Sequence, residues 1–319
     1  MKNVPTIAIS LGDPSGIGPE VVLKALHDPA FRDAAKIIVV GDRDALQPAE
    51  VQCGLKFGGL AGVFLDEPGA MRGWFEMGKI SERCGRAALA YVQRAAELCL
   101  SGAADAMVTA PLNKEAVTRT GMKFTGHTEF IAELCGVQDS RMLLINDRLR
   151  VLHVTTHCSL RAACDASSPE ILTTIRLGHE ALVRLGLERR KIAICGLNPH
   201  AGENGLFGVE DQKNIVPAIA SARSEGIDAS GPFPADTIFL QALGGAYDLV
   251  IAMYHDQGHI PMKLLDFENT VNVSLGLPIL RTSVDHGTAF DIAGQNKANP
   301  ENMKAALKLA IAFARNRRS

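Results

Sequence analysis

Neither sign of charge dominates this sequence of 319 residues, because 33 basic and 35 acidic side chains leave a formal net charge of -2. The chain therefore has no global basic field with which to hold nucleic acid or an anionic membrane, and any anion site must be local. With 47% hydrophobic and 21% charged residues, the composition is that of an ordinary globular protein and not of a disordered one. We expect its partners to be small molecules.

Cysteine pairs and long apolar runs are also missing. The seven cysteines, at 53, 84, 99, 135, 158, 164 and 195, form no CxxC motif, which argues against a disulfide framework or a thiolate zinc site. No run approaches the roughly 20 apolar residues of a membrane-spanning helix. The N-terminal MKNVPTIAIS leads directly into an apolar strand, without the apolar core and cleavage site of a signal peptide. We expect a soluble, cytoplasmic protein.

Short β-branched runs alternate with amphipathic helical stretches, a pattern that predicts a mostly parallel sheet covered by helices. Strands are expected at 6–10, 36–40, 105–110, 141–145, 150–156, 191–195, 248–253 and 270–275, and helices at 18–27, 81–100, 128–135, 169–186, 209–225 and 301–316. The Asn146-Asp147 step between two strand runs predicts a hairpin and an antiparallel pair. No repeat or flexible linker separates the chain, so we expect two lobes that share strands: residues 1–121 plus 287–319, and residues 122–286.

A glycine-rich segment, SLGDPSGIGPE, follows the first strand and begins a helix. Gly12, Gly16 and Gly18 permit tight turning, and Pro19 lies in the first helical turn, where its missing N–H is harmless. The backbone N–H groups of that turn could face an anion, although a simple strand-to-helix turn would explain the same residues. The segment is not GxGxxG, and no such motif occurs elsewhere, so a conventional Rossmann site is disfavoured.

Three of the nine histidines follow strand-like runs in polar segments: His157 in VTTHCSLR, His200 in GLNPHAGENG and His255 in MYHDQGH. Open α/β sheets bind ligands at the carboxyl ends of their strands, so the three could converge as a catalytic metal site with one open coordination position. Each taken alone is better explained as a surface or hydrogen-bonded histidine. His259 lies four residues after His255, and on a helical turn the two would share a face. One could then bind the metal and the other the substrate.

Polar side chains in two further regions could hold an anionic substrate. His127 and Thr128, in GHTEF, begin a predicted helix, where donors favour phosphate or carboxylate, although Thr128 could simply cap the helix. Lys263, Asn272 and Arg281 are spaced at intervals of nine in a stretch that predicts strand, turn and strand. Arginine binds planar oxyanions with two parallel hydrogen bonds, and lysine supplies a point charge.

Three more side chains are candidates for proton transfer. Asp236, in GPFPADT, and Asp256, beside His255, could orient a metal-bound imidazole or relay a proton, and the sequence does not choose between them. Lys114, in TAPLNKE, follows a predicted strand and could act as a general acid, a general base or a pocket donor.

Together these segments resemble one family along nearly the whole chain, the 4-hydroxythreonine-4-phosphate dehydrogenases of pyridoxal phosphate synthesis, with their sister lineage of 4-phosphothreonate and 4-phosphoerythronate dehydrogenases. The matching stretches are GDPSGIGPE, VTAPLNKE, GHTEF, VTTHCSLRAA, GLNPHAGENG, GPFPADT, MYHDQGH, VNVSLGLP and RTSVDHGTAFDIAG. The segment DHGTAFDIAGQNKANP also resembles the nucleotide-binding loop of isocitrate and isopropylmalate dehydrogenases. The resemblance implies their α/β fold, with two lobes, a mixed, mostly parallel sheet and an active site in the cleft between the lobes.

The resemblance also implies roles for individual residues. A divalent metal, zinc with magnesium or cobalt as alternatives, is expected on His157, His200 and His255, the last reaching the site from the partner subunit of a homodimer. The phosphorylated hydroxy-acid substrate is expected on His127, Thr128, Lys263, Asn272 and Arg281. NAD, with NADP as the alternative, is expected against Gly12, Asp285, His286, Gly287, Asp291 and Gly294.

The implied reaction is the NAD-dependent oxidation of 4-phosphooxy-L-threonine at C3, followed by decarboxylation to 3-amino-2-oxopropyl phosphate. The alternative is the dehydrogenation of 4-phospho-D-threonate or 4-phospho-D-erythronate, and His259 bears on this choice. Many family members that act on phosphohydroxythreonine have an apolar residue there, and the sister lineage often has HDQGH. His259 could contact the group that distinguishes the substrates, or it could be a structural hydrogen bond. A phosphate acyltransferase of the same fold and a non-enzymatic phosphometabolite-binding protein are more distant alternatives.

Overall fold

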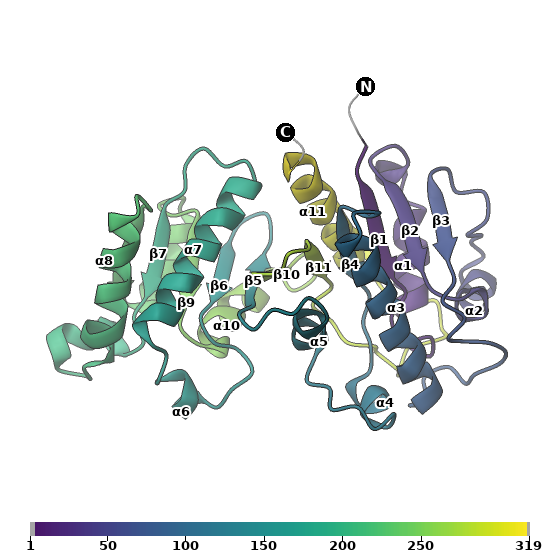
Figure 1. The fold of residues 1–319 in the computed structure, drawn as a ribbon, viewed down its shortest axis with the longest axis horizontal. Coiled ribbons are helices and arrows are strands. Elements are labelled where there is room, and N and C mark those ends of the chain that lie inside the picture. Colours follow the sequence, from purple (N-terminus) through teal and green to yellow (C-terminus); the bar gives the residue numbers. More distant parts are fainter. Residues whose placement is uncertain (1–3, 318–319) are drawn as a thin grey trace. The chain divides into compact units, whose positions relative to one another are not determined.

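The computed structural model describes residues 4–317, which form two compact units (Figure 1). The first unit joins the two ends of the chain, residues 4–140 and 277–317, and the second is Arg141–Gly276. No helix within these described residues has the length and apolar character needed to cross a membrane.

The two units differ in their bounds from the lobes expected from the sequence. Residues 122–140 and 277–286 were expected in the central lobe but belong to the first unit. The first of these segments contains helix α5 (His127–Leu134), which contacts α3 (Glu82–Leu100). The second contains strand β11 (Arg281–Ser283), which pairs with β4 (Ala106–Thr109). Both segments are therefore held by packing and strand pairing inside the first unit.

The sheet of the first unit is entirely parallel, with the order β3-β2-β1-β4-β11. Its strands are β1 (Thr6–Ser10), β2 (Lys36–Val40), β3 (Val63–Asp66), β4 and β11. Ile7, Ile9, Ile37 and Val39 are each at most 1% exposed. These β-branched runs are suited to strands that are covered on both faces, as parallel strands are.

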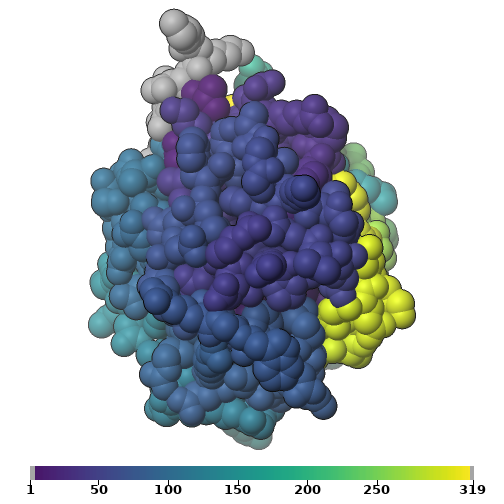
Figure 2. Space-filling model, turned by 90° about the vertical axis from the view of Figure 1, so that its right-hand side faces the viewer, coloured from purple at the N-terminus to yellow at the C-terminus, as the bar shows by residue number. Residues whose placement is uncertain are grey.

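Helices cover the sheet of the first unit. They are α1 (Gly18–Leu26), α2 (Arg43–Cys53), α3, α4 (Lys114–Thr118), α5 and α11 (Glu301–Arg317), with a short 3-10 helix at Pro29–Phe31. Helix α3 packs against β1, β2 and β4 on the side that faces the viewer in Figure 1, whereas α11 packs against β4 and β11 and contacts α1. Figure 2 views this unit from the side of β3, where N-terminal segments form most of the surface and the C-terminal helix, in yellow, lies along one flank.

The sheet of the second unit is mixed, with the order β10-β5-β6-β9-β7-β8. Its strands are β5 (Arg141–Ile145), β6 (Arg150–His153), β7 (Ile192–Cys195), β8 (Ala229–Phe233), β9 (Leu249–Ala252) and β10 (Val271–Leu275). Strand β5 is antiparallel to both β6 and β10, and the other pairs are parallel. The predicted hairpin is confirmed, and the side chain of Asn146 holds its turn by accepting hydrogen bonds from the N–H groups of Arg148 and Leu149.

The helices of the second unit lie on both faces of its sheet. They are α6 (Leu160–Ala163), α7 (Ser168–Arg184), α8 (Val216–Ser224), α9 (Ala235–Leu243) and α10 (His255–Leu265), with a 3-10 segment at Pro199–Gly205 and a π turn at Asp211–Ile215. Ile238 of α9 and Met262 of α10 pack in one cluster with Val151 of β6. Gly178 of α7 lies against the next residue of that strand, Leu152. Since successive strand residues point to opposite faces, α9 and α10 cover one face and α7 the other.

Helix α10 is where the structure differs most from the sequence prediction. The segment around His255 was expected to be a polar loop, and Lys263 was expected in a stretch of strand and turn, but both lie on α10. Gly258 and Pro261 lie inside this helix, and both residue types disfavour a helix interior. The helix forms nevertheless because Met262, which is fully buried, packs it against the sheet.

Candidate functional site

Three loops meet at the carboxyl edge of the first unit's sheet. They follow β1, β4 and β11. Asp13 N–H donates to the carbonyl of Pro111 at 3.0 Å, and Ile17 N–H donates to the carbonyl of Thr288 at 3.0 Å. The strands β2 and β4 flank β1 on opposite sides, so the direction of winding reverses here, which is where open α/β sheets bind ligands.

The glycine loop after β1 lies very close to the loops that follow β4 and β11. Gly12 has φ +75°, and a Cβ there would lie 2.4 Å from the carbonyl oxygen of Pro111. Gly16 lies equally close to Thr288, with a Cβ position only 2.9 Å from Cβ of that residue. Backbone contact between loops therefore accounts for these two glycines without a ligand, and it also brings the loop against the segment that follows β11.

That segment contains the remaining residues expected to contact the cofactor. Asp285 N–H donates to Asn302 Oδ1, which ties the start of the loop to α11. Nδ1 of His286 lies 3.0 Å from the Gly287 carbonyl, and its Nε2 is buried with no hydrogen-bond partner among residues 4–317. Asp291 is exposed. The expected cofactor residues thus lie on loops that touch one another at one edge of one sheet.

A second cluster of polar groups surrounds the start of α5. The helix begins at His127 with Gly126 as its N-cap, so Thr128 does not cap it. Instead, Thr128 Oγ1 accepts a hydrogen bond from Nη1 of Arg281 at 3.1 Å. Nη2 and Nε of the same guanidinium donate to Thr109 Oγ1 at 2.8 and 3.2 Å. Strands β4 and β11 are paired neighbours, and their pairing fixes Arg281 in this position.

The electrostatics of this cluster favour an anion. Burial lowers the pKa of Arg281 to about 10, an effect that Glu129 partly offsets, so the guanidinium stays charged at neutral pH. Burial, together with the charges of Arg281 and Lys114, holds the pKa of His127 well below its ordinary value. Nε2 of this neutral imidazole is buried and has no hydrogen-bond partner among residues 4–317. A phosphate or carboxylate at the N-terminus of α5 would meet both a cation and an available imidazole nitrogen.

The other residues expected to contact the substrate lie elsewhere. Lys114 is exposed at the first position of α4, and its Nζ lies 3.9 Å from the place that a Cβ would take on Gly126, so it belongs near the α5 cluster. Lys263 lies on α10 with Nζ 5.1 Å from the centre of the Phe267 ring. Asn272 lies on β10, and its Oδ1 is buried without a hydrogen-bond partner in the described chain. The first unit therefore contains His127, Thr128 and Arg281, and the second contains Lys263 and Asn272.

Two of the three histidines expected to bind a metal, His157 and His255, lie near each other in one chain, although His255 was expected to reach the site from the partner subunit. The rings of His157 and His255 have their centres 6.0 Å apart. Nδ1 of His255 lies 2.7 Å from Oδ1 of Asp256, so this carboxylate fixes the imidazole with its proton on Nδ1 and leaves Nε2 as the ligand atom, an arrangement typical of metal-bound histidines. Asp236, the other candidate carboxylate, is exposed in the first turn of α9.

Two further histidines lie behind this pair. His259 stacks on His255 with ring centres 3.6 Å apart. Nδ1 of His153 lies 3.0 Å from the carbonyl oxygen of Met142, so it carries the proton, and its Nε2 accepts from Nδ1 of His259 at 3.1 Å. Burial, reinforced by His259, lowers the pKa of His153 to about 3, so it stays neutral. The contact between His153 and His259 was not predicted from the sequence, because 106 residues separate the two.

His200 lies apart from these rings, in a strained turn. His200, Ala201, Glu203 and Asn204 all have positive φ, and the ring of His200 is 6.0 Å from that of Phe207. The buried carboxylate of Asp211 holds the start of the turn by accepting the N–H groups of residues 197 and 198. Nowhere in residues 4–317 do three or more His, Cys, Asp or Glu side chains gather closely enough to hold a metal ion. The expected set of three histidines is therefore not assembled within one chain.

Thr109 contributes to the α5 cluster but was not predicted from the sequence. This residue is the last of β4, is fully buried and accepts two of the hydrogen bonds of Arg281. Its position just before the turn at Pro111 was visible in the sequence, but a threonine at the end of a strand gives no sign of which side chain it meets across the sheet.

The fold of the chain is that of the isocitrate dehydrogenase-like α/β proteins. The isocitrate dehydrogenase of Methylococcus capsulatus superposes with a TM-score of 0.51 at 15% identity, over 99% of this chain and 88% of that one. At this identity the likeness shows the fold alone.

Sequence comparison identifies the family. The family described as Pyridoxal phosphate biosynthetic protein PdxA matches residues 33–310, and the chain belongs to it. The D-threonate 4-phosphate dehydrogenase of Salmonella typhimurium is 44% identical, over 97% of this chain and 99% of the relative. The 4-hydroxythreonine-4-phosphate dehydrogenase of Trichlorobacter lovleyi is also 44% identical, with 98% of each chain covered.

A solved structure agrees with these relatives. The 4-hydroxythreonine-4-phosphate dehydrogenase of Klebsiella pneumoniae has a TM-score of 0.88 at 42% identity, with 98% of each chain covered. The expected family and fold class are thus confirmed, and the protein is an oxidoreductase of the dehydrogenase class.

Proposed function

We propose that this protein is an NAD-dependent dehydrogenase that oxidises 4-phosphooxy-L-threonine at C3, followed by decarboxylation to 3-amino-2-oxopropyl phosphate. The observation that carries the proposal is the buried cationic cluster at the start of α5. Arg281 stays charged there beside the buried Nε2 of His127, as a site for a phosphorylated acid requires. Lys263 and Asn272 of the second unit are proposed to contribute further donors to the same substrate.

A phosphorylated sugar acid is the second candidate substrate. D-threonate 4-phosphate dehydrogenases stand among relatives of the same 44% identity as the 4-hydroxythreonine-4-phosphate dehydrogenases. His259 also bears on this choice, because its Nδ1 is engaged by His153 and its ring stacks on His255. These contacts place a polar ring directly against the proposed metal ligand His255.

We propose that a divalent metal ion binds to His157 and His200 of one copy and to the partner subunit's His255. The pairing of His255 with Asp256 leaves Nε2 of that imidazole as a ligand atom, and zinc suits such ligands, with magnesium or cobalt as alternatives. When bound, the metal would supply Lewis acidity toward the substrate oxygens. Asp256 orients His255, whereas Lys114, beside the anion cluster, and Asp236 are the candidates for holding or moving a proton.

The active form is proposed to be a homodimer that shares this metal site. Large apolar side chains project from the helices that cover one face of the second unit's sheet: Leu240 of α9 is 70% exposed, and Ile260 and Leu264 of α10 are 55% and 83% exposed. Exposed apolar groups gathered on neighbouring helices favour burial against a partner. A second copy of the chain covering α10 would bring its His255 to the first copy and complete the ligand set.

NAD, with NADP as the alternative, is proposed to lie along the loops at the carboxyl edge of the first unit. The glycine loop after β1 contacts the segment from Asp285 to Gly294 through Gly16 and Ile17, which meet Thr288, and this contact supports the placement. Backbone N–H groups at the start of α1 provide donors for a diphosphate there.

One assay tests the proposal. NADH formation is measured with 4-phosphooxy-L-threonine, 4-phospho-D-threonate and 4-phospho-D-erythronate, before and after treatment with a chelator, and again after zinc, magnesium or cobalt is restored. The main proposal predicts the highest kcat/KM with 4-phosphooxy-L-threonine and a loss of activity that the metal reverses. Higher kcat/KM with a sugar acid would establish the second candidate instead. If no substrate gave NADH with metal present, the dehydrogenase proposal for these compounds would be wrong.

A further inference from the structure

Residues 284–300, all within the described part of the chain, join β11 to α11 without forming a helix or a strand. We call them the β11–α11 segment. Irregular segments of this length are uncommon in compact domains, where they usually form functional loops or linkers. Because the segment belongs to no helix or sheet, contacts with neighbouring elements must fix its position. It contains five of the residues proposed to contact the cofactor: Asp285, His286, Gly287, Asp291 and Gly294.

The first half of the segment is fixed by contacts with main-chain atoms. Ile17 N–H donates to the carbonyl of Thr288 at 3.0 Å. A Cβ on Gly78 would lie only 2.7 Å from the carbonyl oxygen of Phe290, so the backbone at these two residues is in close contact. Gly78 N–H in turn donates to the carbonyl of Ser15 at 2.7 Å. Both contacts therefore hold the first half of the segment beside the glycine loop.

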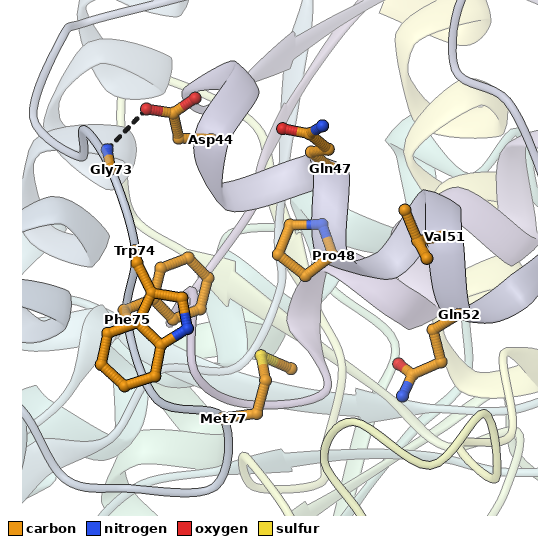
Figure 3. A pocket seen from close by; sticks show the side chains of 9 residues that line it. All are labelled: Asp44, Gln47, Pro48, Val51, Gln52, Gly73, Trp74, Phe75 and Met77. Atoms are coloured by element: carbon orange, nitrogen blue, oxygen red, sulfur yellow. Dashed lines mark hydrogen bonds between the residues drawn. The ribbon is translucent and has the colours of Figure 1, made fainter.

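The middle of the segment lies at the rim of a pocket. A Cβ on Gly294 would lie 3.3 Å from Cβ of Met77 and 3.6 Å from Nε2 of Gln52. Met77 and Gln52 line a pocket of about 640 Å³ between α2 and residues 73–77, and Figure 3 shows both side chains there. Gly294 thus touches two side chains beside an open pocket and not a packed core. Packing alone therefore holds the segment weakly at this point.

The end of the segment is held by an ion pair of α1. Nζ of Lys24 donates to Oε1 of Glu20 at 2.7 Å. The same Nζ donates to the carbonyl oxygens of Asn296 and Ala298 at 3.2 and 2.9 Å. The N–H of Ala298 donates to Oε1 of Glu20 at 2.8 Å. Three hydrogen bonds therefore cross from Glu20 and Lys24 to the end of the segment, and we call this pair the α1 clasp.

Burial strengthens the α1 clasp. The side chain of Glu20 is 2% exposed and that of Lys24 is 18% exposed. Hydrogen bonds that involve charged groups are stronger than those between neutral groups, and a low local dielectric strengthens them further. Glu20 and Lys24 are four residues apart, which places both on the same side of α1. The end of the segment is therefore fixed to a helix whose start lies at the glycine loop.

We propose that Glu20 and Lys24 are positioning residues for the cofactor, because the α1 clasp holds the β11–α11 segment in the conformation that binds the dinucleotide. The inference rests on the proposed use of NAD or NADP. The hydrogen bonds of the clasp reach residues 296 and 298, beyond the residues proposed to contact the cofactor. The clasp therefore acts through the segment, and it affects the affinity for the cofactor and not the chemical step.

Isothermal titration calorimetry with NAD and ADP-ribose tests this role. Glu20→Ala is expected to raise the Kd for both ligands roughly 5- to 30-fold, the effect of losing one or two hydrogen bonds that favour the binding conformation. Glu20→Gln keeps an oxygen that can accept from the N–H of Ala298 and is expected to recover most of the loss. In turnover, Glu20→Ala should raise the KM for NAD, whereas kcat and the KM for the phosphorylated substrate should change little.

Hydrogen exchange of the ligand-free protein measures the segment itself. Backbone amides of residues 285–298 are expected to exchange faster in Glu20→Ala than in the parent protein. Lys304→Met is the matched control, because Lys304 pairs with Asp28 and Glu301 of the same unit at 3.0 and 2.9 Å. This control should keep the Kd and the exchange of the parent protein. A lower Tm of Glu20→Ala with both quantities unchanged would show that the clasp serves stability alone, and would overturn the inference.

The same measurements separate this inference from the proposed function. If the parent protein binds neither NAD nor NADP, the proposed cofactor is wrong, and the positioning role falls with it even where exchange is faster in Glu20→Ala. If NADH forms at a normal rate while Glu20→Ala leaves the Kd for NAD unchanged, the reaction is right and the positioning role is wrong. An equal rise in Kd for Glu20→Ala and Lys304→Met would also contradict the inference, since any lost ion pair would then have the same effect.

Discussion

Arg281 keeps its positive charge although only 2% of its surface is exposed. Its hydrogen bonds to Thr109 and Thr128 satisfy guanidinium donors without neutralising the charge, because both acceptors are hydroxyls. Next to it, His127 is held neutral by burial and by the nearby cations. The two residues therefore act together: one supplies charge, and the other supplies an uncharged imidazole nitrogen that an oxyanion can reach.

The neutrality of His127 predicts a specific pH dependence of stability. Its pKa in the folded chain lies well below the ordinary 6.5, so below that pH the unfolded chain binds a proton that the folded chain does not. Stability that is present above pH 6.5 is therefore lost as the pH falls toward the folded pKa. His127→Gln removes this pH-dependent contribution to stability. Between neutral pH and about pH 5.5, the free energy of unfolding should therefore fall by about 1 kcal/mol less in the variant than in the parent protein.

Thermal unfolding at neutral and mildly acidic pH measures this difference. His27→Gln is the control, because His27 caps the end of α1, away from the α5 cluster, where its Nδ1 lies 2.9 Å from the Leu23 carbonyl. Added inorganic phosphate should reduce the acid sensitivity of the parent protein, since an anion on His127 favours its protonated form. Identical acid sensitivity of parent and His127→Gln proteins would show that this imidazole is not neutral by burial.

Helix α10 carries His255, His259 and Lys263 and thus determines much of the second unit's polar chemistry. Its register depends on Gly258, which lies directly against the strand β6. A Cβ at this position would come within 2.3 Å of Nε2 of His153 and 2.8 Å of Cγ1 of Val151. The glycine therefore lets the helix approach the sheet closely enough for His259 to reach His153.

Gly258→Ala tests this close approach. In an exposed helix, alanine would stabilise by about 1 kcal/mol relative to glycine, but here the methyl group must displace the helix, and overpacking costs roughly 1–3 kcal/mol. We expect a lower Tm and weaker metal binding, because His255 shifts with the helix. Gly58→Ala is the control, since a Cβ there meets nothing within 4 Å. A Tm above that of the parent protein would show that helix propensity outweighs the contact.

Elements with strong periodicity were predictable from the sequence, and those defined by contacts were not. The β5 and β6 hairpin and the long helices α3, α7 and α11 were predicted to within a few residues, because local pattern alone defines them. Helix α10 was missed because Gly258 and Pro261 oppose it locally and only packing explains it. The same limit applies to the site: motifs gave the residue types, but the contacts of Arg281 with Thr109 span 172 positions.

The three histidines proposed as metal ligands do not come together within one chain among residues 4–317. His157 and His255 approach each other, His200 lies on a separate strained turn, and no group of three possible ligands forms within residues 4–317. Its helices α9 and α10 meanwhile expose Leu240, Ile260 and Leu264. The apolar surface of α10 supports the proposed homodimer, in which the partner subunit's His255 would join His157 and His200 of the first copy.

Subunit complementation tests this arrangement. His200→Ala and His255→Ala should each be inactive alone, because every site of either homodimer lacks one ligand. When the two proteins are mixed and allowed to exchange subunits, each mixed dimer has two different sites. One site lacks both His200 and His255, and the other has all three histidines. If half of the dimers are mixed, activity should return to about a quarter of that of the parent protein.

The controls decide between a shared site and a site within one chain. Mixing His157→Ala with His200→Ala should restore nothing, since both lost ligands belong to the same side of the shared site. Leu264→Asp should weaken the dimer, seen as a smaller mass in light scattering, and should lower metal content in parallel, because a charge replaces an 83% exposed leucine on α10. If the His200→Ala and His255→Ala mixture stays inactive while mass measurements show mixed dimers, each metal site belongs to a single chain.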